Sequence, residues 1–341
     1  MNVLPHNRPT FGTEEEQAVV RVIRSGWVAQ GVEVENLEDE FCGFLGLPYK
    51  HAVALSSGTA ALFMALWALG ARGKKVAFPV YACAALRNAL SLIGSDEILI
   101  DTAPGSPNIS INALRQVSTD IAIIPHMFGI PISTSGLDSI AVIEDCAQAI
   151  GAMVDGVQVG LQGRAGIYSF YATKLITSGG QGGMFVSKNK DLVDAVRDYR
   201  EFDQRRDDKK RFNFQMTDLQ AAVGREQLKK LPEFLNKRSE IFGKYKEAGL
   251  KLLDIDDSSD NNLMPVRYRA VLLTDKPQKT IASLEMAGVK SIVPIEDWEL
   301  LGEPVLFPSA FSLTKKTVSL PIYPSLSEEN IKTVISAIER L

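Results

Sequence analysis

The sequence predicts an α/β fold in two parts, with helices packed on a mostly parallel sheet. Short apolar runs of strand length alternate with segments of helical periodicity, which is typical of βαβ units. The chain has 341 residues, a length that favours about two domains. Hydrophobic residues make up 45% and charged residues 23%, so the composition is that of a globular protein and not of a disordered one.

Charge and hydropathy argue against two classes of partner. Lys and Arg number 37 against 41 Asp and Glu, so the net charge of −4 offers no basic field to nucleic acid or anionic lipid. The longest apolar run, 60–71, is well short of the roughly 20 residues that a membrane span needs. The first residues lack the basic and apolar regions of a secretory signal. We therefore expect a cytoplasmic protein that binds neither nucleic acid nor membrane.

Cysteine and histidine are few and scattered. The chain has three cysteines without a Cys-x-x-Cys pair, and its three histidines lie far apart. We therefore expect neither a metal site nor a disulfide framework, so any catalysis must use other residues or a cofactor.

Local patterns predict the elements of the first part in order. Thr13 and Glu16 have the spacing of a capping box, and apolar residues follow at helical spacing until Gly26. Seven runs are predicted as strands: 52–55, 75–80, 97–101, 120–125, 140–144, 165–170 and 183–187. Three helical segments lie between them: 58–69, 82–93 and 111–117. The glycine-rich stretch 178–183 is a candidate functional turn.

A smaller α+β unit is expected after a connecting helix. The helical pattern begins at Met216 and continues past Pro232 towards Ala248. We place the domain change near residue 235, which gives domains 1–235 and 236–341. The later elements are a surface loop at 254–262, a strand at 266–273, a helix at 279–287 and a terminal helix at 325–341 opened by a Ser325/Glu328 capping box.

A hydroxyl-rich helix start follows the first predicted strand. Ser57, Gly58 and Thr59 come between that strand and an apolar helix, so their amides and hydroxyls lie at a helix N-terminus. Phosphate binds readily at such a position. An ordinary cap before a core helix accounts for the same stretch.

Two more polar groups leave predicted strands. Asp145 ends an apolar strand at the sheet edge where open α/β folds bind ligands, and it could pair with a cationic ring nitrogen or cap the next helix. Lys174 follows Ser169 and precedes the glycine-rich turn, so it could form a Schiff base, although most lysines are only solvated. Phosphate, ring nitrogen and aldehyde are the polar groups of pyridoxal phosphate (PLP), and each now has a matching residue.

At these residues the chain resembles the DegT-type (DegT/StrS) sugar aminotransferases, PLP enzymes of fold type I. The resemblance runs from about Asn7 to the C-terminus. It implies a large domain with a mostly parallel seven-stranded sheet flanked by helices and a smaller C-terminal α+β domain. The motifs that carry it are Ser25-Gly26-Trp27, Ser57-Gly58-Thr59-Ala60-Ala61-Leu62, His126-Met127-Phe128-Gly129, Glu144-Asp145-Cys146-Ala147-Gln148, Ser169-Phe170 with Thr173-Lys174, Asn213 with Met216-Thr217-Asp218, and Leu320-Pro321-Ile322-Tyr323-Pro324.

The resemblance implies a reaction and the residues that perform it. Lys174 would be the Schiff-base lysine and Asp145 the partner of the pyridine nitrogen, with Gln148 beside the oxygen edge of the ring. The amino group would pass from L-glutamate, through the pyridoxamine form (PMP), to a C3 or C4 keto group of a nucleotide-linked deoxysugar. Such sugars would serve cell-surface polysaccharide or secondary-metabolite biosynthesis.

The resemblance also implies a shared site. Gly58, Thr59 and Ser169, with Ser57 at the same helix start, would hold the phosphate. Asn213 would reach it from the neighbouring subunit, so the active enzyme would be at least a dimer.

Several residues depart from the family pattern or stay open. Cys83 stands where the family usually has an aromatic residue stacked on the ring, and Tyr81 is the alternative. Gln215 replaces a usual arginine, and the C-terminal histidine is missing around 295–304. The mixed-charge stretch 205–211 is either a solvated loop or a contact for a diphosphate.

Two further residues lie close to the predicted site. His126 is either a hydrogen-bonded structural residue or a neighbour of the cofactor. Cys146 is expected to be a small buried residue, because the adjacent carboxylate would raise the pKa of its thiol.

Two other functions compete with transamination. A PLP-dependent sugar dehydratase of the same family would replace the Schiff-base lysine by histidine, and Lys174 argues against it. A non-catalytic PLP-binding regulator would not need the full set of Lys174, Asp145 and Thr59.

Overall fold

A seven-stranded sheet organises the larger part of the chain in a computed structural model that describes residues 3–255 and 262–340. The strand order is β1-β9-β8-β5-β4-β2-β3. Neighbours from β8 to β3 are parallel, and β9 is antiparallel to β8 and β1, so the predicted mostly parallel sheet is confirmed. The strands are β1 (Ala52–Leu55), β2 (Lys75–Pro79), β3 (Asp96–Ile100), β4 (Ile121–Pro125), β5 (Ala141–Asp145), β8 (Ala165–Ser169) and β9 (Gly183–Val186).

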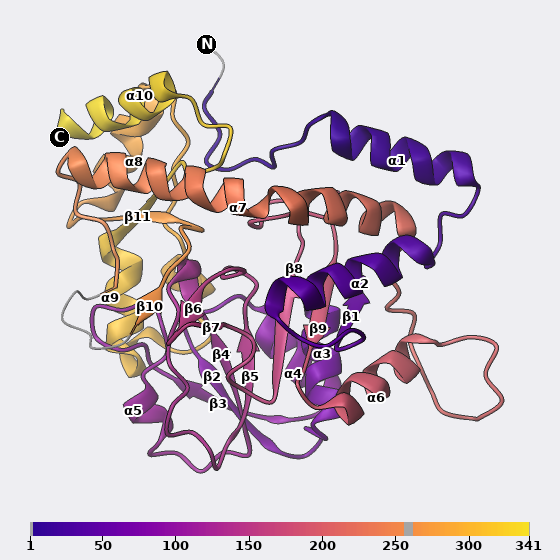
Figure 1. Cartoon of the computed structure of the whole chain (residues 1–341). Helices are drawn as coiled ribbons and strands as arrows, with labels where there is room; N and C mark the ends of the chain where they lie inside the picture. Colours follow the sequence, from indigo (N-terminus) through magenta and orange to yellow (C-terminus); the bar gives the residue numbers. More distant parts are fainter. Residues whose placement is uncertain (1–2, 256–261, 341) are drawn as a thin grey trace.

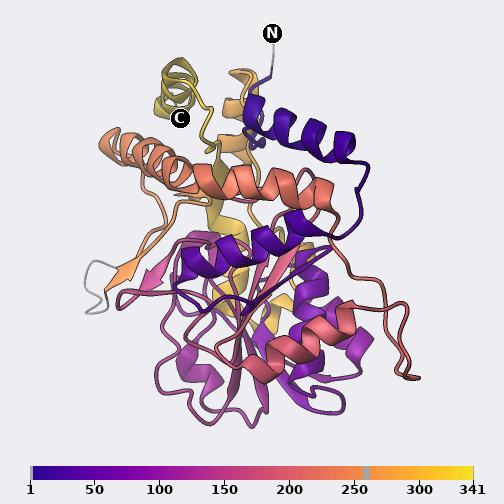
Figure 2. The same cartoon turned by 45° about the vertical axis from the view of Figure 1, so that its right-hand side comes forward.

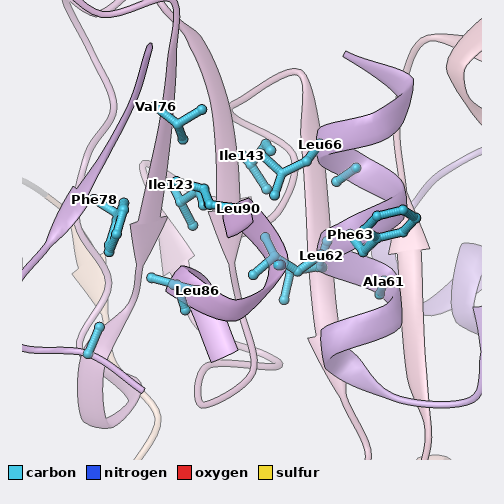
Figure 3. Packing of buried hydrophobic residues seen from close by; sticks show 14 of the residues in the cluster. Ala61, Leu62, Phe63, Leu66, Val76, Phe78, Leu86, Leu90, Ile123 and Ile143 are labelled. Atoms are coloured by element: carbon cyan, nitrogen blue, oxygen red, sulfur yellow. The ribbon is translucent and has the colours of Figure 1, made fainter. Parts of the chain in front are cut away.

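Two helices bury one face of this sheet. In α3 (Gly58–Ala68) almost every side chain is apolar, and α4 (Ala85–Ile93) packs beside it. Figure 3 shows Leu62 and Leu66 of α3 and Leu86 and Leu90 of α4 gathered near Phe78, Ile123 and Ile143 of the strands. Burying large aliphatic and aromatic side chains stabilises the fold by roughly 1.5–3 kcal/mol each. The N-terminus of α3 is thereby fixed against the sheet.

The other layer includes helices that the sequence patterns above did not predict. Helix α2 (Val32–Leu45) packs on β1 and α7 (Asp218–Glu247), and α6 (Lys190–Arg200) contacts α3 and β1. Helix α2 has a readable signal, because Val34, Leu37 and Phe41 recur at helical spacing and are fully buried. Helix α5 (Ile111–Leu114) is shorter than predicted.

Helix α1 (Thr13–Ser25) is confirmed, but its predicted cap is wrong by one residue. Gly12 is the N-cap, and the Glu15 carboxylate accepts the Gly12 amide at 2.8 Å. Glu15 is buried against Lys230 and Gln227 of α7, whereas Glu16 is exposed. Tertiary contacts therefore selected which acid caps the helix.

Helix α7 runs unbroken past Pro232 and through residue 235, the predicted domain change. Figure 1 shows it crossing the molecule, with the large sheet on one side and α10 on the other. The division at residue 235 stays a prediction. The remaining elements are β6 (Met153–Val154), β7 (Val157–Gln158), β10 (Leu263–Met264), β11 (Ala270–Leu273), α8 (Pro277–Met286), α9 (Pro308–Lys316), β12 (Thr317–Leu320), α10 (Glu328–Glu339) and short 3₁₀ turns at Met127–Gly129, Asp297–Glu299 and Pro304–Leu306.

The C-terminal elements differ from their predictions mainly at the ends. Strand β11 is shorter than expected and pairs with β12. Helix α10 is capped by Ser327, whose hydroxyl accepts the Asn330 amide at 3.2 Å, so the Ser325/Glu328 capping box is wrong. Most of the loop predicted at 254–262 lies outside the described residues. Within the described residues, no helix combines the length and hydropathy that a membrane crossing requires.

One long connection stands away from the body. The chain between α6 and α7, residues 201–217, has no helix or strand. It projects outward in both views (Figures 1 and 2). Its tip is therefore placed to contact something other than its own sheet.

Candidate active site

A cavity of about 360 Å³ opens at the carboxyl ends of the parallel strands. Asp145 ends β5 and Ser169 ends β8, while Ser57 follows β1. Open α/β sheets bind ligands at this edge because loops and helix N-termini converge there. All predicted site residues except Asn213 line the cavity, namely Ser57, Gly58, Thr59, Cys83, Asp145, Gln148, Ser169 and Lys174.

The N-terminus of α3 forms one end of the cavity. The Ser57 hydroxyl accepts the Ala60 amide at 3.1 Å, which caps the helix. The amides of Gly58 and Thr59 lie in the first turn, where the helix itself provides no acceptor. A Cβ on Gly58 would lie 2.7 Å from Cβ of Ser169, so glycine is needed for β8 to approach the helix. Free amides and two hydroxyls in one cradle fit a phosphate group.

Lys174 lies on the loop between β8 and β9, and the glycine-rich turn holds that loop in place. Ala172 donates its amide to Gly180 O at 3.1 Å, and Lys174 donates its amide to Tyr171 O at 2.9 Å. Gly180 has a φ of +139°, a region that L side chains rarely adopt. The predicted functional turn is therefore a support for the Lys174 loop.

Asp145 faces the cavity with few partners of its own. Among the described residues its carboxylate has one hydrogen bond, from the Ala147 amide at 2.9 Å. Burial raises the pKa of Asp145, and the Ala147 amide and the Lys174 charge oppose that rise. A carboxylate that burial penalises gains much from a cationic partner, such as a protonated ring nitrogen.

Gln148 and His126 shape the cavity wall. Gln148 Oε1 accepts the amide of Phe128 at 2.8 Å and supports a left-handed turn, since Phe128 has a φ of +60°. His126 Nδ1 accepts the Ile132 amide at 3.1 Å, so its proton lies on Nε2, which donates to Glu144 at 3.0 Å. His126 is completely buried, and the structure therefore favours its structural interpretation.

The two candidates for the ring-stacking position separate clearly. Cys83 is exposed and lines the cavity, but Tyr81 is fully buried and packs edge-on against Phe128. Tyr81 as a substitute for the stacking aromatic is therefore wrong, because its ring belongs to the core. The cavity has one aromatic lining residue, Tyr171, which together with Met127 and Gln181 was missed by sequence reasoning. All three lie within or beside the motifs quoted above.

Asn213 lies on the projecting chain 201–217 and does not reach the cavity of its own subunit. It is exposed, and its side-chain oxygen accepts the Gln215 amide at 3.0 Å. The mixed-charge stretch before it is partly self-neutralised, since Arg211 pairs with Asp198 and Asp207. Cys146 is buried as expected, and burial, then Glu144 and Asp145, raise the pKa of its thiol.

Comparisons with known proteins agree with this geometry. The spore coat polysaccharide biosynthesis protein SpsC of Bacillus subtilis is 29% identical to this chain, over 98% of this chain and 96% of SpsC. The aminotransferase from Psychrobacter cryohalolentis has a TM-score of 0.86 at 26% identity, covering 98% of this chain and 97% of its own.

A further solved structure shares the fold at lower identity. The putative sugar aminotransferase Spr1654 from Streptococcus pneumoniae, in its PMP form, has a TM-score of 0.89 at 20% identity, covering 99% of this chain and 97% of its own. Spr1654 has also been solved in a PLP form.

These findings confirm the family resemblance, the type I fold, the aminotransferase class and PLP as the cofactor of the family. The model of the DegT/DnrJ/EryC1/StrS aminotransferase family matches residues 9–339, nearly the whole chain. The chain therefore belongs to the DegT/DnrJ/EryC1/StrS aminotransferase family.

Proposed function

We propose that this aminotransferase moves an amino group from L-glutamate to the C3 or C4 keto group of a nucleotide-linked keto-deoxysugar. The observation that carries the proposal is the single cavity of about 360 Å³ that brings together Lys174, Asp145 and the N-terminus of α3. The name of the relative SpsC, a spore coat polysaccharide biosynthesis protein, supports a sugar of cell-surface polysaccharide as the product. A cytoplasmic location stays a prediction.

The residues of the cavity divide into those that hold the cofactor and those that move protons. The N-terminus of α3, with the hydroxyls of Thr59 and Ser169, would hold the phosphate of PLP. Asp145 would hold a proton on the ring nitrogen, and Gln148 would offer its amide nitrogen to the ring oxygen. When bound, PLP supplies the electron sink that makes the donor's α-carbon acidic.

Lys174 is assigned the proton transfers. Its Nζ is the amine in the cavity that can bond the cofactor aldehyde and then act as a general base at the α-carbon of the donor. Base and donor carbon must lie within hydrogen-bond reach, and the glycine-supported loop fixes the Lys174 backbone for that purpose. Asp145, one strand away on β5, keeps its negative charge towards the same space.

The direct test is to incubate the purified PLP-loaded protein with L-glutamate and a panel of nucleotide-linked 3-keto and 4-keto sugars. Mass spectrometry is expected to show an amino sugar and 2-oxoglutarate in equal amounts. A deoxygenated sugar without glutamate consumption would instead identify a dehydratase. Tight PLP binding without turnover of any pair would identify a regulator.

We also propose a homodimer with shared active sites, in which Asn213 contacts the phosphate site of the partner subunit. The support is its exposed place on a chain that projects from the body in Figures 1 and 2. A twofold dimer makes two equivalent composite sites.

Mixed dimers test this arrangement. Lys174→Ala and Asn213→Asp subunits, each impaired alone, are expected to recover about one quarter of the wild-type rate after exchange, because half of the dimers are mixed and each mixed dimer has one intact site. Native mass spectrometry confirms the exchange. Mixed dimers as inactive as both parents would place Asn213 in its own subunit's site.

A further inference from the structure

Three positive charges surround Tyr268, next to the cavity. Lys174 Nζ lies 5.4 Å from the centre of the Tyr268 ring, and the guanidinium carbon of Arg269 lies 5.5 Å from the same centre. Arg238 donates to the Tyr268 carbonyl oxygen at 3.2 Å. Burial alone would raise the pKa of Tyr268, but Lys174, Arg269 and Arg238 together hold it below its usual value. The surroundings of this ring therefore have a positive potential.

No carboxylate among the described residues forms an ion pair with any of these three cations, in contrast to Arg267 nearby, which pairs with Asp254. Arg238 is completely buried and bonds only carbonyl oxygens, the nearest being Ile322 O at 2.9 Å. Burial lowers the pKa of Arg238 to about 10, so it remains charged at neutral pH. Uncompensated charge in a site of low dielectric attracts an anionic ligand.

Arg269 is the member of this group that can bind a ligand directly. Its side chain is partly exposed, and one guanidinium nitrogen donates to Ser319 Oγ at 3.1 Å and lies 3.4 Å from His6 Nε2. Burial, with Arg269 and Arg238, lowers the pKa of His6 to about 3, so this neighbour is neutral. Of the five N–H donors of a guanidinium, those on the other two nitrogens of Arg269 have no partner among the described residues.

Arg269 lies one side chain from the cavity on two sides. On one side, the Tyr268 ring contacts Lys174 of the cavity. On the other side, the Arg269 guanidinium lies 5.9 Å from the Phe128 ring, and the Phe128 amide is bound by Gln148 of the cavity wall. A substrate that reacts at Lys174 and extends past Tyr268 reaches this guanidinium.

We propose that Arg269 is a specificity-determining residue that binds a carboxylate group of the substrate reacting at Lys174. This inference rests on the function proposed above and names the chemistry of one substrate group. A guanidinium presents a planar pair of donors that matches a carboxylate, and charge-assisted pairs of this kind are strong. The carboxylate belongs either to the amino donor or to an acidic sugar.

Two unreactive probes separate these sources without turnover. Glutarate carries the two carboxylates of glutamate and no amino group, and glucuronate carries the carboxylate of an acidic sugar. Calorimetry of the PLP-loaded enzyme is expected to show about 10- to 100-fold weaker binding of one probe to Arg269→Gln than to the wild type. Arg269→Lys keeps the charge without the fork and should lie between. Arg72→Gln removes the same charge before the start of β2, at the opposite sheet edge, and should bind like the wild type.

Steady-state kinetics identifies the source again. Weaker glutarate binding with a raised KM for L-glutamate assigns the carboxylate to the amino donor, and weaker glucuronate binding with a raised KM for the sugar assigns it to the sugar. Equal behaviour of the wild type and Arg269→Gln towards both probes, or no binding of either probe, overturns the role of Arg269. Wild-type transamination in that case leaves the proposed function standing. Arg269-dependent binding without any amino transfer would overturn the function instead.

Discussion

The two acids that end β5, Glu144 and Asp145, lie in opposite surroundings. Glu144 is completely buried and accepts five hydrogen bonds, from His126, the amides of Gly160, Gln162 and Gly163, and the Gln162 side chain. Asp145 faces the cavity and has one hydrogen bond among the described residues. Successive side chains of a strand point to opposite faces, so adjacent acids acquire different tasks.

Their pKa values differ in direction for the same reason. Burial would raise the pKa of Glu144, but His126 and the loop amides hold it below its usual value. Burial raises the pKa of Asp145 because one amide and the Lys174 charge do not compensate. A carboxylate satisfied by the protein stabilises the fold, whereas one left unsatisfied is available to a ligand.

The largest expected effect is on the cavity side. Lys174→Ala should leave no detectable amino transfer, because the amine that bonds the cofactor and moves the proton is gone. Lys188→Ala, an exposed lysine beyond the end of β9, is the matched control and should be fully active. Borohydride reduction of the PLP-loaded wild type followed by peptide mapping should place the pyridoxyl group on Lys174. Its recovery on another lysine would contradict the assignment.

Asp145→Asn should follow in size. The amide keeps the shape but lacks the charge that holds a ring proton, so turnover should fall about 10²- to 10⁴-fold. Cofactor occupancy should change far less. The free energy of unfolding of the apoprotein, measured in urea, should not decrease, since the ionised carboxyl is penalised by burial. A variant with near-normal turnover would show that another group protonates the ring.

Glu144→Gln should act on stability first. All five partners of Glu144 are donors, and the amide nitrogen of glutamine would face donors, so we expect a loss of about 3 kcal/mol in the free energy of unfolding. Urea titration of the apoprotein measures it. Glu35→Gln, at an exposed position of α2, is the matched control.

The pH dependence should sharpen the same contrast. The pKa of Glu144 is lowered in the folded state, so its contribution is present above its unfolded value of about 4.3 and is lost as the pH falls through the folded value. The stability gap between wild type and Glu144→Gln should therefore shrink in acid. The pKa of Asp145 is raised, so its ionisation costs stability as the pH rises, and Asp145→Asn should gain relative to the wild type in that direction. Parallel pH profiles of the two variants would refute the division.

The smallest effect concerns the cysteines. Cys83 in the cavity is exposed, whereas Cys42 and Cys146 are buried and burial raises the pKa of both thiols. A thiol reagent should therefore label one cysteine rapidly in the native apoprotein, and bound PLP should slow that labelling. Cys83→Ser should remove the rapid phase and change the free energy of unfolding by less than about 0.5 kcal/mol. Rapid loss of two thiols would mean that the layer beneath β5 opens readily.

Local patterns determined the strands and most of the site. The seven strands were readable because each is a short apolar run, and Ser57, Asp145, Ser169 and Lys174 were readable because each directly follows a strand. Loops at one sheet edge converge whatever the rest of the chain does, so these side chains had to meet. The family motifs then supplied their chemistry.

Other features depended on contacts between distant segments. The choice of Glu15 over Glu16 as a cap came from α7, and the exclusion of Tyr81 from the cavity came from its packing on Phe128. The placement of Arg269 and Tyr268 beside Lys174 joins a C-terminal segment to the loop after β8. Periodicity reports only which face of an element is buried, whereas the partner of that face is fixed by packing across the whole chain. The sequence therefore determined the cofactor site, and the tertiary structure decided which charges surround its substrate.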